Sequence, residues 1–226
     1  MNRILTFILL VALVCAALPA QETPQALLLR MEKSLASIDA FQADFEQSSS
    51  SQAVSKPLHQ KGRLIFSKPD RMRWEYAAPE KNIYVFRDGL LLSYFPEDNQ
   101  LWRQTIPKEK YETEIMVLLA GRGSLTQKYA VEDSPFPGGG PGVAQLKLTP
   151  REESDYSYLL LELDRAGASI RKVIFFGWGG DRQEFAFSRF KTGIKPSAGL
   201  FEIKVPKDCE IIDGTAPVRK LNFSLE

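Results

Sequence analysis

The sequence predicts a mainly β protein, in which a large antiparallel sheet curls and two helices cover its concave face. First, roughly eleven or twelve short runs of β-forming residues are separated by turn chemistry, the pattern of a large sheet. Second, residues 71–76 alternate between apolar and charged side chains, as a half-buried strand does. Third, the chain holds 14 Phe, 3 Trp and 4 Met. So much apolar surface, together with two helices, indicates a capped and curved sheet.

The first 20 residues have the layout of a secretory signal peptide. A short basic start containing Arg3 precedes an apolar run and the small residue Ala20. The run is too short for a comfortable membrane span. We therefore expect residues 1–20 to be removed, with cleavage near Ala20. An alternative is a lipoprotein signal that ends at Cys15, although Val14 stands where such a signal favours a small residue.

Residues 21–226 are expected to form a single domain that buries its own core. Loss of Arg3 would reduce the 29 basic residues to 28, against 28 acidic residues, so the mature chain is close to neutral. A nucleic-acid partner would favour a basic excess. Of the two cysteines only Cys209 would remain, so no internal disulfide can form. This favours a bacterial periplasm, with Cys209 as a small buried residue.

An amphipathic helix is expected near the start of the mature chain. Thr23 can cap its N-terminus, and Pro24 suits the first helical position. Apolar residues at positions 27, 31, 35 and 38 then share one stripe. A second, short helix is expected over residues 111–121, YETEIMVLLAG, where the apolar run must be buried against a sheet face.

The stretch 62–76, GRLIFSKPDRMRWEY, reads as two antiparallel strands that meet at residues 68–70. In the second strand Met72, Trp74 and Tyr76 point one way, and the charged residues between them point the other. Asp88-Gly89 is a strong hairpin signal between two later strands. A polar loop is expected at 48–52. Besides residues 62–76, the expected strands are 41–46, 82–87, 90–95, 101–106, 127–131, 143–149, 156–164, 168–176, 183–190, 200–205 and, more weakly, 218–225.

The residues of a conventional active site are scarce. The single histidine, His59, lies in a polar stretch and is expected to be solvated, so neither a histidine metal cluster nor a Cys-His pair is expected. The glycine clusters at 138–142 and 177–181 lack the sequence context of phosphate-binding loops and read as turns. Acidic pairs such as Glu152-Glu153 lie in or beside turns, where solvated charge is usual. We therefore expect a protein that is not an enzyme and needs no cofactor.

The chain resembles the LolA family of periplasmic lipoprotein carriers over nearly its whole mature length. The resemblance is carried, in the family's order, by FQADFEQ at 41–47, GRLIFSKPDRMRWEY at 62–76, the hairpin region 78–100, the apolar helix 115–120, LKLTP at 146–150 and FEIKVPKDCEIID at 201–213. It implies an incomplete β-barrel of about eleven strands with a helical lid over a hydrophobic cavity. It also implies a monomeric periplasmic chaperone that takes lipoproteins released by an inner-membrane ABC transporter to an outer-membrane acceptor.

By the same resemblance, the cavity is expected to be lined by the inward side chains of the first strands and by the lid helix. The expected strand residues are Leu64, Phe66, Met72, Trp74, Ile83 and Val85, and the expected lid residues are Ile115, Leu118 and Leu119. Which alternating face of each strand points inward is inferred, and a register error of one residue would invert the set for that strand.

The sequence departs from the family at Lys68, because well-studied members carry arginine immediately before the proline of this hairpin, where it bonds to carbonyls of the lid. Lysine has three donors but lacks the planar fork of arginine, so it should hold a lid less firmly. The hypothesis is that Lys68 still tethers the lid, so that Lys68→Leu impairs lipoprotein release or acceptance.

Two alternatives of related fold stay open at this point. One is a membrane-anchored lipoprotein receptor lipidated at Cys15, which an intact mass of the mature protein would distinguish. The other is a periplasmic lipid-binding sensor or transporter, for which a single domain of this length is a mild counter-argument.

Overall fold

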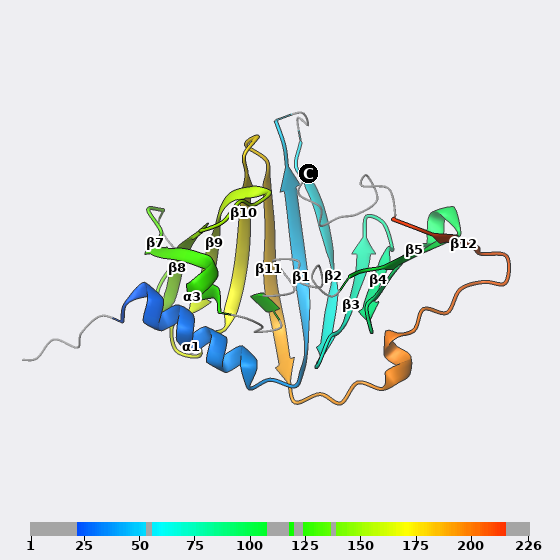
Figure 1. Ribbon diagram of the computed structural model, residues 1–226, viewed down its shortest axis with the longest axis horizontal. Coiled ribbons are helices and arrows are strands. Elements are labelled where there is room, and N and C mark those ends of the chain that lie inside the picture. Colours follow the sequence, from blue (N-terminus) through cyan, green and yellow to red (C-terminus); the bar gives the residue numbers. More distant parts are fainter. Residues whose placement is uncertain (1–21, 53–55, 108–117, 120–123, 137–138, 216–226) are drawn as a thin grey trace, which may run out of the picture.

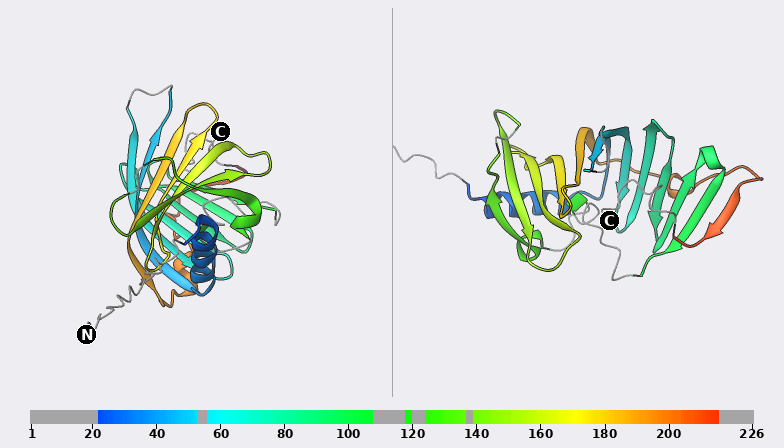
Figure 2. Two further views of the ribbon diagram at one scale, coloured as in Figure 1. Left: turned by 90° about the vertical axis from the view of Figure 1, so that its left-hand side faces the viewer. Right: turned by 90° about the horizontal axis from the view of Figure 1, so that it is seen from above.

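The computed structural model describes residues 22–52, 56–107, 118–119, 124–136 and 139–215. In this part of the chain twelve strands form one sheet, in the order β12-β6-β5-β4-β3-β2-β1-β11-β10-β9-β8-β7. Neighbouring strands are antiparallel, except that β12 lies parallel to β6. The sheet is strongly curved and unclosed, and helix α1 lies against its inner side (Figures 1 and 2). The predicted incomplete barrel is confirmed.

The elements follow the chain in an order that alternates strands and short connections. Their bounds are α1 Pro24–Ala36, β1 Ala40–Ser50, β2 Leu58–Ser67, β3 Arg71–Ala78, β4 Ile83–Arg87, β5 Leu90–Phe95, η1 Pro96–Asp98, β6 Gln100–Thr105, α3 Leu125–Lys128, β7 Tyr129–Asp133, β8 Val143–Pro150, β9 Tyr156–Asp164, β10 Ile170–Gly177, β11 Arg182–Thr192, η3 Ala198–Phe201 and β12 Glu210–Asp213.

Helix α1 begins and packs as its sequence predicts. Thr23 is the N-cap, and its side chain accepts a hydrogen bond from the Ala26 amide at 3.2 Å. The apolar stripe is buried against the inner side of the sheet through Leu27, Leu28, Met31 and Leu35. Burial of this stripe supplies the stability that an isolated helix of this length would lack.

The hairpin β2–β3 has the register that its alternation predicts. Leu64 pairs with Trp74, and Phe66 pairs with Met72. All four side chains are buried in one cluster on the concave face. At the next hairpin, Asp88 and Gly89 both have positive φ, 50° and 79°, as a two-residue turn between twisted strands requires.

Two apolar clusters lie on opposite faces of the sheet. The larger one fills the concave face and includes side chains from α1 and from most of the strands. The smaller one lies on the convex face over β2–β6 and contains Ile65, Val85, Leu92, Tyr94, Leu101 and Phe201. The segment 194–209, which connects β11 to β12, covers this convex cluster with Ile194, Leu200, Ile203 and Val205.

Several predicted elements differ from the observed ones. The expected strand 200–205 is instead the 3-10 helix η3 followed by irregular chain, because its apolar residues pack onto the convex cluster without pairing with a strand. The expected strand 127–131 begins two residues later, after the short helix α3. The polar residues after 47 do not form a loop at once, since β1 extends to Ser50.

Other local expectations have mixed outcomes. Strand β12, at 210–213, was not predicted. His59 is exposed as expected, but it lies in strand β2 and not in a loop. Cys209 is half-buried and packs at the margin of the convex cluster. The expected signal peptide, most of the expected helix 111–121 and the weak strand 218–225 lie outside the described residues.

Within the described ranges, no helix combines the length and the apolar character needed to cross a membrane. The same ranges contain no group of three or more His, Cys, Asp or Glu side chains placed to hold a metal ion.

Candidate functional site

A row of mostly apolar side chains crosses six neighbouring strands on the concave face. Because directly paired residues of antiparallel strands point to the same face, the register places the row as Ala43, Leu64, Trp74, Tyr84, Ser93 and Trp102. The first four of these side chains belong to the buried hydrophobic core. The row therefore gives this half of the sheet a continuous apolar inner surface.

Aromatic rings pack edge to face at the centre of this surface. The Phe45 ring lies 4.8 Å from the Trp74 ring and 4.9 Å from the Tyr76 ring, both in T-shaped arrangements. Trp74 also lies 5.9 Å from Phe185, and Tyr76 lies 5.7 Å from Tyr84. Such pairs each contribute about 0.5–1.5 kcal/mol beyond their buried area. The centre of the concave face is thus an aromatic cluster, to which β1, β3, β4 and β11 contribute.

The structure places most of the sequence-predicted site residues together. Leu64, Phe66, Met72 and Trp74 are buried on the concave face. Leu118 and Leu119 are helical and are buried in the same cluster. Ile115 lies outside the described residues.

The prediction that Ile83 and Val85 share this face is wrong. Both belong to the convex cluster, whereas Tyr84 and Phe86 point to the concave side. The pairing of Trp74 with Tyr84 fixes this register. All residues of β4 from 83 to 86 are apolar or aromatic, so their alternation carries no signal for the inward face, and the choice was inverted by one residue.

Sequence reasoning also missed several residues of the concave surface. These are Phe45, Tyr84, Phe86, Phe95 and Phe185. Phe45 and Phe185 lie in the strands expected at 41–46 and 183–190, so the period-2 argument used for residues 71–76 could have identified them. The sequence alone does not show which face Phe95 points to, and its inward direction can be assigned only when the pairing of β5 with β4 is known.

The few polar atoms at the centre of the concave face are paired. The Tyr76 hydroxyl donates to Gln47 Oε1 at 2.6 Å, and Trp74 Nε1 lies 2.9 Å from the Met72 sulfur. Burial, with a smaller contribution from Tyr84, raises the pKa of Tyr76 well above its ordinary value. Tyr76 therefore remains neutral at physiological pH, and the face carries no charge there.

Lys68 contacts helix α1. Its side-chain hydrogen bond and ion pair do not involve Leu118 or Leu119, the described residues of the predicted 111–121 helix. The Lys68 ammonium donates a hydrogen bond to the carbonyl of Ala36, the last residue of α1, and lies 3.8 Å from the Asp39 carboxylate. A cation at a helix C-terminus satisfies an otherwise free carbonyl and interacts favourably with the helix dipole. The predicted tether thus has a counterpart, but it holds the other helix over the concave face.

Polar contacts fix α1 at further points along its length. The Arg30 guanidinium donates to the carbonyls of Arg165 and Ala166, at 2.6 and 3.1 Å, in the turn between β9 and β10. Gln25 donates to the Val131 carbonyl at 2.9 Å. The buried Glu32 accepts a hydrogen bond from the Leu125 amide at the start of α3. Apart from its apolar stripe, α1 is therefore held by side-chain hydrogen bonds at its start, in its middle and at its end.

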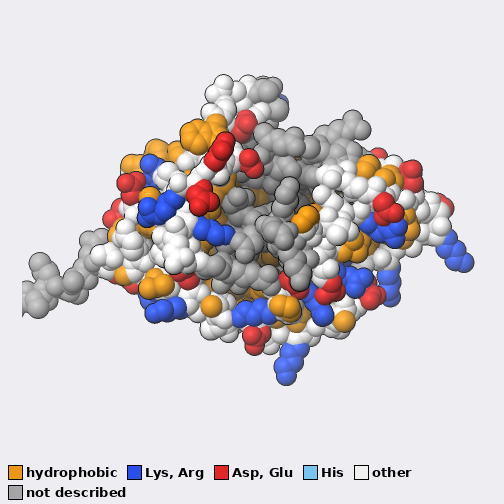
Figure 3. Space-filling model, viewed as in Figure 1, with side chains coloured by type: hydrophobic (Ala, Val, Ile, Leu, Met, Phe, Trp, Pro, Cys, Tyr) orange, Lys and Arg blue, Asp and Glu red, His pale blue; other side chains and the backbone are white. Residues whose placement is uncertain are grey.

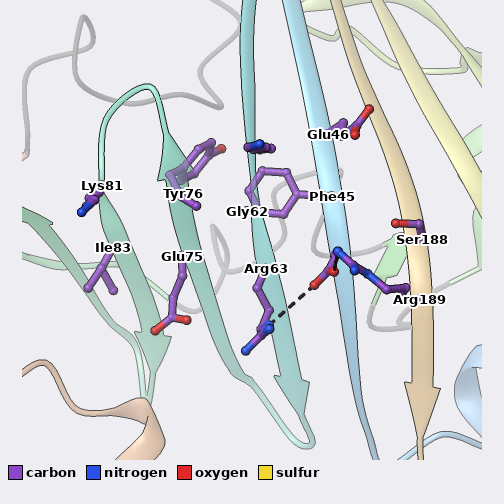
Figure 4. A pocket seen from close by; sticks show the side chains of 13 residues that line it. Phe45, Glu46, Gly62, Arg63, Glu75, Tyr76, Lys81, Ile83, Ser188 and Arg189 are labelled. Carbon is purple, nitrogen blue, oxygen red and sulfur yellow. Dashed lines mark ion pairs between the residues drawn. The ribbon is translucent and has the colours of Figure 1, made fainter.

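The convex face carries a hollow of about 570 Å³ with a different character. Its lining includes charged residues of both signs from β1–β3, the β3–β4 connection and β11, and Figure 4 shows Arg63, Glu75, Lys81 and Arg189 among them. Asp44 lies between Arg63, at 3.6 Å, and Arg189. This hollow would leave alkyl chains among charged groups, so the concave face is the better candidate site for an apolar ligand.

The face of the molecule seen in Figure 3 shows no single dominant charge. Lysine and arginine side chains are interspersed with aspartate and glutamate over the face seen in Figure 3. This agrees with the formal net charge of +1 for the whole chain. No basic patch of the kind that a nucleic-acid interface requires is visible among the described residues on this face.

The protein has a curved, unclosed sheet whose aromatic inner face lies under a helix. These features place it in the class of β-sheet proteins that enclose an apolar interior. Within this class, the model of the family described as outer membrane lipoprotein carrier protein LolA matches residues 36–204. The chain belongs to this family. It is 24% identical to the outer-membrane lipoprotein carrier protein of Methylococcus capsulatus, over 92% of this chain and 97% of that one.

The chain is also similar to a second carrier protein and to a solved structure. The chain is 27% identical to the outer-membrane lipoprotein carrier protein of Vibrio cholerae, over 81% of this chain and 88% of that one. Among solved structures, an uncharacterized conserved protein from Thermus thermophilus has a TM-score of 0.54 at 17% identity, with 84% of this chain and 98% of that chain covered. The latter similarity concerns the fold alone.

Proposed function

We propose that this protein is a periplasmic lipoprotein carrier that holds the acyl chains of its cargo against the concave face and takes them from the inner to the outer membrane. The observation that carries the proposal is the continuous aromatic surface centred on Phe45, Trp74 and Tyr84. Family membership supports the same role.

The physical need for such a surface follows from the cargo. An acyl chain gains about 0.8 kcal/mol for each methylene group removed from water, so two or three chains together gain tens of kcal/mol. An apolar interior can supply this free energy without a covalent step or a bound nucleotide. Accordingly, we propose that the protein acts by binding alone and is not an enzyme.

The proposed partners follow from the route. An inner-membrane ABC transporter would deliver the lipoprotein, and an outer-membrane acceptor would receive it. A monomer of this size suffices, because the binding surface lies within one sheet. The segment expected to be a signal peptide would direct the chain to the periplasm.

Uptake of acyl chains requires the cover of the concave face to move. Leu64 and Met72 are almost fully buried, and the apolar stripe of α1 is part of the same cluster. Residues such as methionine and aromatics repack readily around flexible chains. We therefore propose that cargo replaces contacts of the cover, and that Lys68, at the end of α1, helps to return the helix to its place.

Two neighbouring leucines offer a matched test of the proposed binding face. Leu91 packs on the concave cluster, whereas Leu90 packs on the convex cluster, and both are half-buried in β5. Binding of a triacylated lipoprotein would be measured by the amount of cargo that the carrier keeps soluble after release from liposomes. We expect Leu91→Glu to lower this amount at least tenfold, because the new carboxylate would lie among alkyl chains.

Leu90→Glu is the matched control and should retain most of the cargo. A wild-type protein that keeps no acylated cargo soluble would refute the carrier function. Equal losses in the two variants would refute the assignment to the concave face, provided that circular dichroism shows both variants to be folded.

A further inference from the structure

A buried hydrogen-bond donor without a partner lies on the concave face. Trp102 is in β6 and pairs with Ser93 of β5, so its ring extends the row that begins at Ala43 and passes through Trp74 and Tyr84. The indole nitrogen Nε1 of Trp102 is buried and has no hydrogen-bond partner in the structure as described. Such a donor is costly unless a ligand provides an acceptor.

The other two tryptophans differ from Trp102 in this respect. Trp74 Nε1 lies 2.9 Å from the Met72 sulfur, and Trp178 Nε1 donates to the Ser154 carbonyl at 2.9 Å. A second buried nitrogen without a hydrogen-bond partner among the described residues is Arg87 Nε. Arg87 belongs to β4 and, like Val85, occupies a position that points to the convex face. Of these atoms, only Trp102 Nε1 is thus an unpaired donor on the proposed acyl-binding face.

The composition of the row shows which part of an acylated ligand would meet this donor. The row is apolar from Leu64 to the aromatic rings of Trp74 and Tyr84, and it becomes polar at Ser93. Along β6 the inward positions on either side of Trp102 are Gln100 and Gln104. Alkyl chains would therefore lie along β2–β4 and Leu91, and the polar linkage that joins the chains would lie at Ser93 and Trp102.

We propose that Trp102 Nε1 donates a hydrogen bond to an ester carbonyl of the diacylglyceryl group of the cargo and so fixes the depth at which the acyl chains bind. This inference rests on the proposed carrier function. The ester carbonyl is an acceptor without a proton to donate, and it lies at the junction between the alkyl chains and the polar part of the lipid. Trp102 is thus a specificity residue for ester-linked chains.

The test compares two lipids that differ only at this linkage. Dipalmitoylglycerol carries two ester carbonyls, whereas the matched dihexadecyl glycerol diether carries none. Each lipid would displace a hydrophobic dye from the mature protein, from the Trp102→Phe variant and from the Trp178→Phe control. We expect the wild type and the control to bind the diester roughly three- to tenfold more tightly than the diether, which is the range for one net hydrogen bond.

The Trp102→Phe variant should bind the two lipids equally, with its affinity for the diether unchanged. Because phenylalanine keeps an aromatic ring but has no donor, we expect the variant to be at least as stable as the wild type without ligand. Persistence of the ester preference in Trp102→Phe, or its absence in the wild type, would overturn the inference while leaving the carrier function in place. Displacement by neither lipid would refute the carrier function and the inference with it.

A second measurement needs no variant in the binding experiment. The chain has 3 tryptophans, so its indole N–H signals are few enough to resolve by NMR and to assign with the two phenylalanine variants. The Trp102 indole proton should move downfield with the diester and not with the diether, while the Trp178 signal stays in place. Equal shifts of the Trp102 signal with both lipids would contradict a carbonyl acceptor.

Discussion

Two neighbouring rows of side chains, one on each face of the sheet, differ sharply although they are one residue apart in every strand. The concave row reads Ala43, Leu64, Trp74, Tyr84, Ser93 and Trp102, and the convex row reads Asp44, Arg63, Glu75, Ile83, Tyr94 and Leu101. The convex row is charged over β1–β3 and becomes apolar over β4–β6. Only the concave row could accept alkyl chains over most of its length.

Each of the two apolar surfaces has a cover that is held by hydrogen bonds from side chains to backbone carbonyls. On the convex face, Arg73 donates to the carbonyls of Leu200 and Glu202, at 3.0 and 3.1 Å, and holds the segment 194–209 against the sheet. On the concave face, α1 is held by hydrogen bonds from Gln25 and Arg30 and, at its last residue, by the half-exposed Lys68. If acyl chains enter the concave face as proposed, the hydrogen bonds of α1 must break, whereas those that Arg73 makes on the convex face need not.

The largest expected effect is a loss of stability in the concave aromatic cluster. Phe45→Ala should lower the free energy of unfolding by about 3–5 kcal/mol, because Phe45 is fully buried between Trp74 and Tyr76. Phe176, which stacks on Tyr158 on the convex face and is half-buried, provides the control. Phe176→Ala should cost only about 1 kcal/mol. Urea denaturation of both variants measures the difference, and equal costs would remove the distinction between the faces.

The next effect concerns the convex cover. Arg73→Met should destabilise the protein by about 2–3 kcal/mol, because it removes the donor to both carbonyls and the 2.7 Å ion pair with Glu75. Acyl binding should be unchanged, since Arg73 lies on the other face. Arg63→Met is the matched control, with an expected cost below about 1 kcal/mol because the Arg63 side chain is half exposed and Asp44 keeps its ion pair with Arg189. Reduced cargo binding by folded Arg73→Met would contradict the separation of the two covers.

A smaller effect is expected at the end of α1. Lys68→Leu should cost about 0.5–1 kcal/mol, the usual range for a cation at a helix C-terminus. Hydrogen exchange should accelerate in the last turn of α1, and cargo release or acceptance should be impaired. Lys68→Arg should restore both properties. Unchanged exchange and unchanged transfer in Lys68→Leu would show that this contact does not hold the helix.

The smallest effect is a pH dependence on the convex face. Burial alone would raise the pKa of Glu184, but Lys172, at 2.9 Å, and Arg182 outweigh it and hold this pKa below its ordinary value of 4.5. Since the carboxylate is more acidic in the folded state, its contribution is present above the unfolded pKa and is lost as the pH falls through the folded one. Glu184→Gln should therefore flatten the loss of stability below about pH 4.5. An identical acid profile in urea denaturation would contradict this role.

The sequence predicted the strands best where apolar and charged residues alternate. Residues 71–76 showed which side chains point inward, and the structure agrees at Met72, Trp74 and Tyr76. Alternation failed in β4, where inward and outward residues are both apolar because the segment 194–209 covers its outer face. Residues 200–205 belong to this segment. Their sequence resembled a strand because the apolar residues Phe201, Ile203 and Val205, which lie at the convex cluster, are spaced two apart.

The long-range contacts of the site could not be predicted from local patterns. The carbonyl that Lys68 reaches is 32 residues earlier in the chain, and the carbonyls that Arg73 reaches are 127 and 129 residues later. Likewise, the inward position of Trp102 depends on its pairing with Ser93. Such contacts are set by strand order and register, which propensity and periodicity do not determine.

Site-specific photocrosslinking tests most directly whether the concave face holds acyl chains. A photoreactive residue would replace either Leu91 or Leu90, which are adjacent and point to opposite faces. Each protein would be loaded with a lipoprotein that carries radiolabelled acyl chains and would then be irradiated. We predict that position 91 becomes labelled and that position 90 does not. Equal labelling of the two positions, or labelling of position 90 alone, would contradict the account.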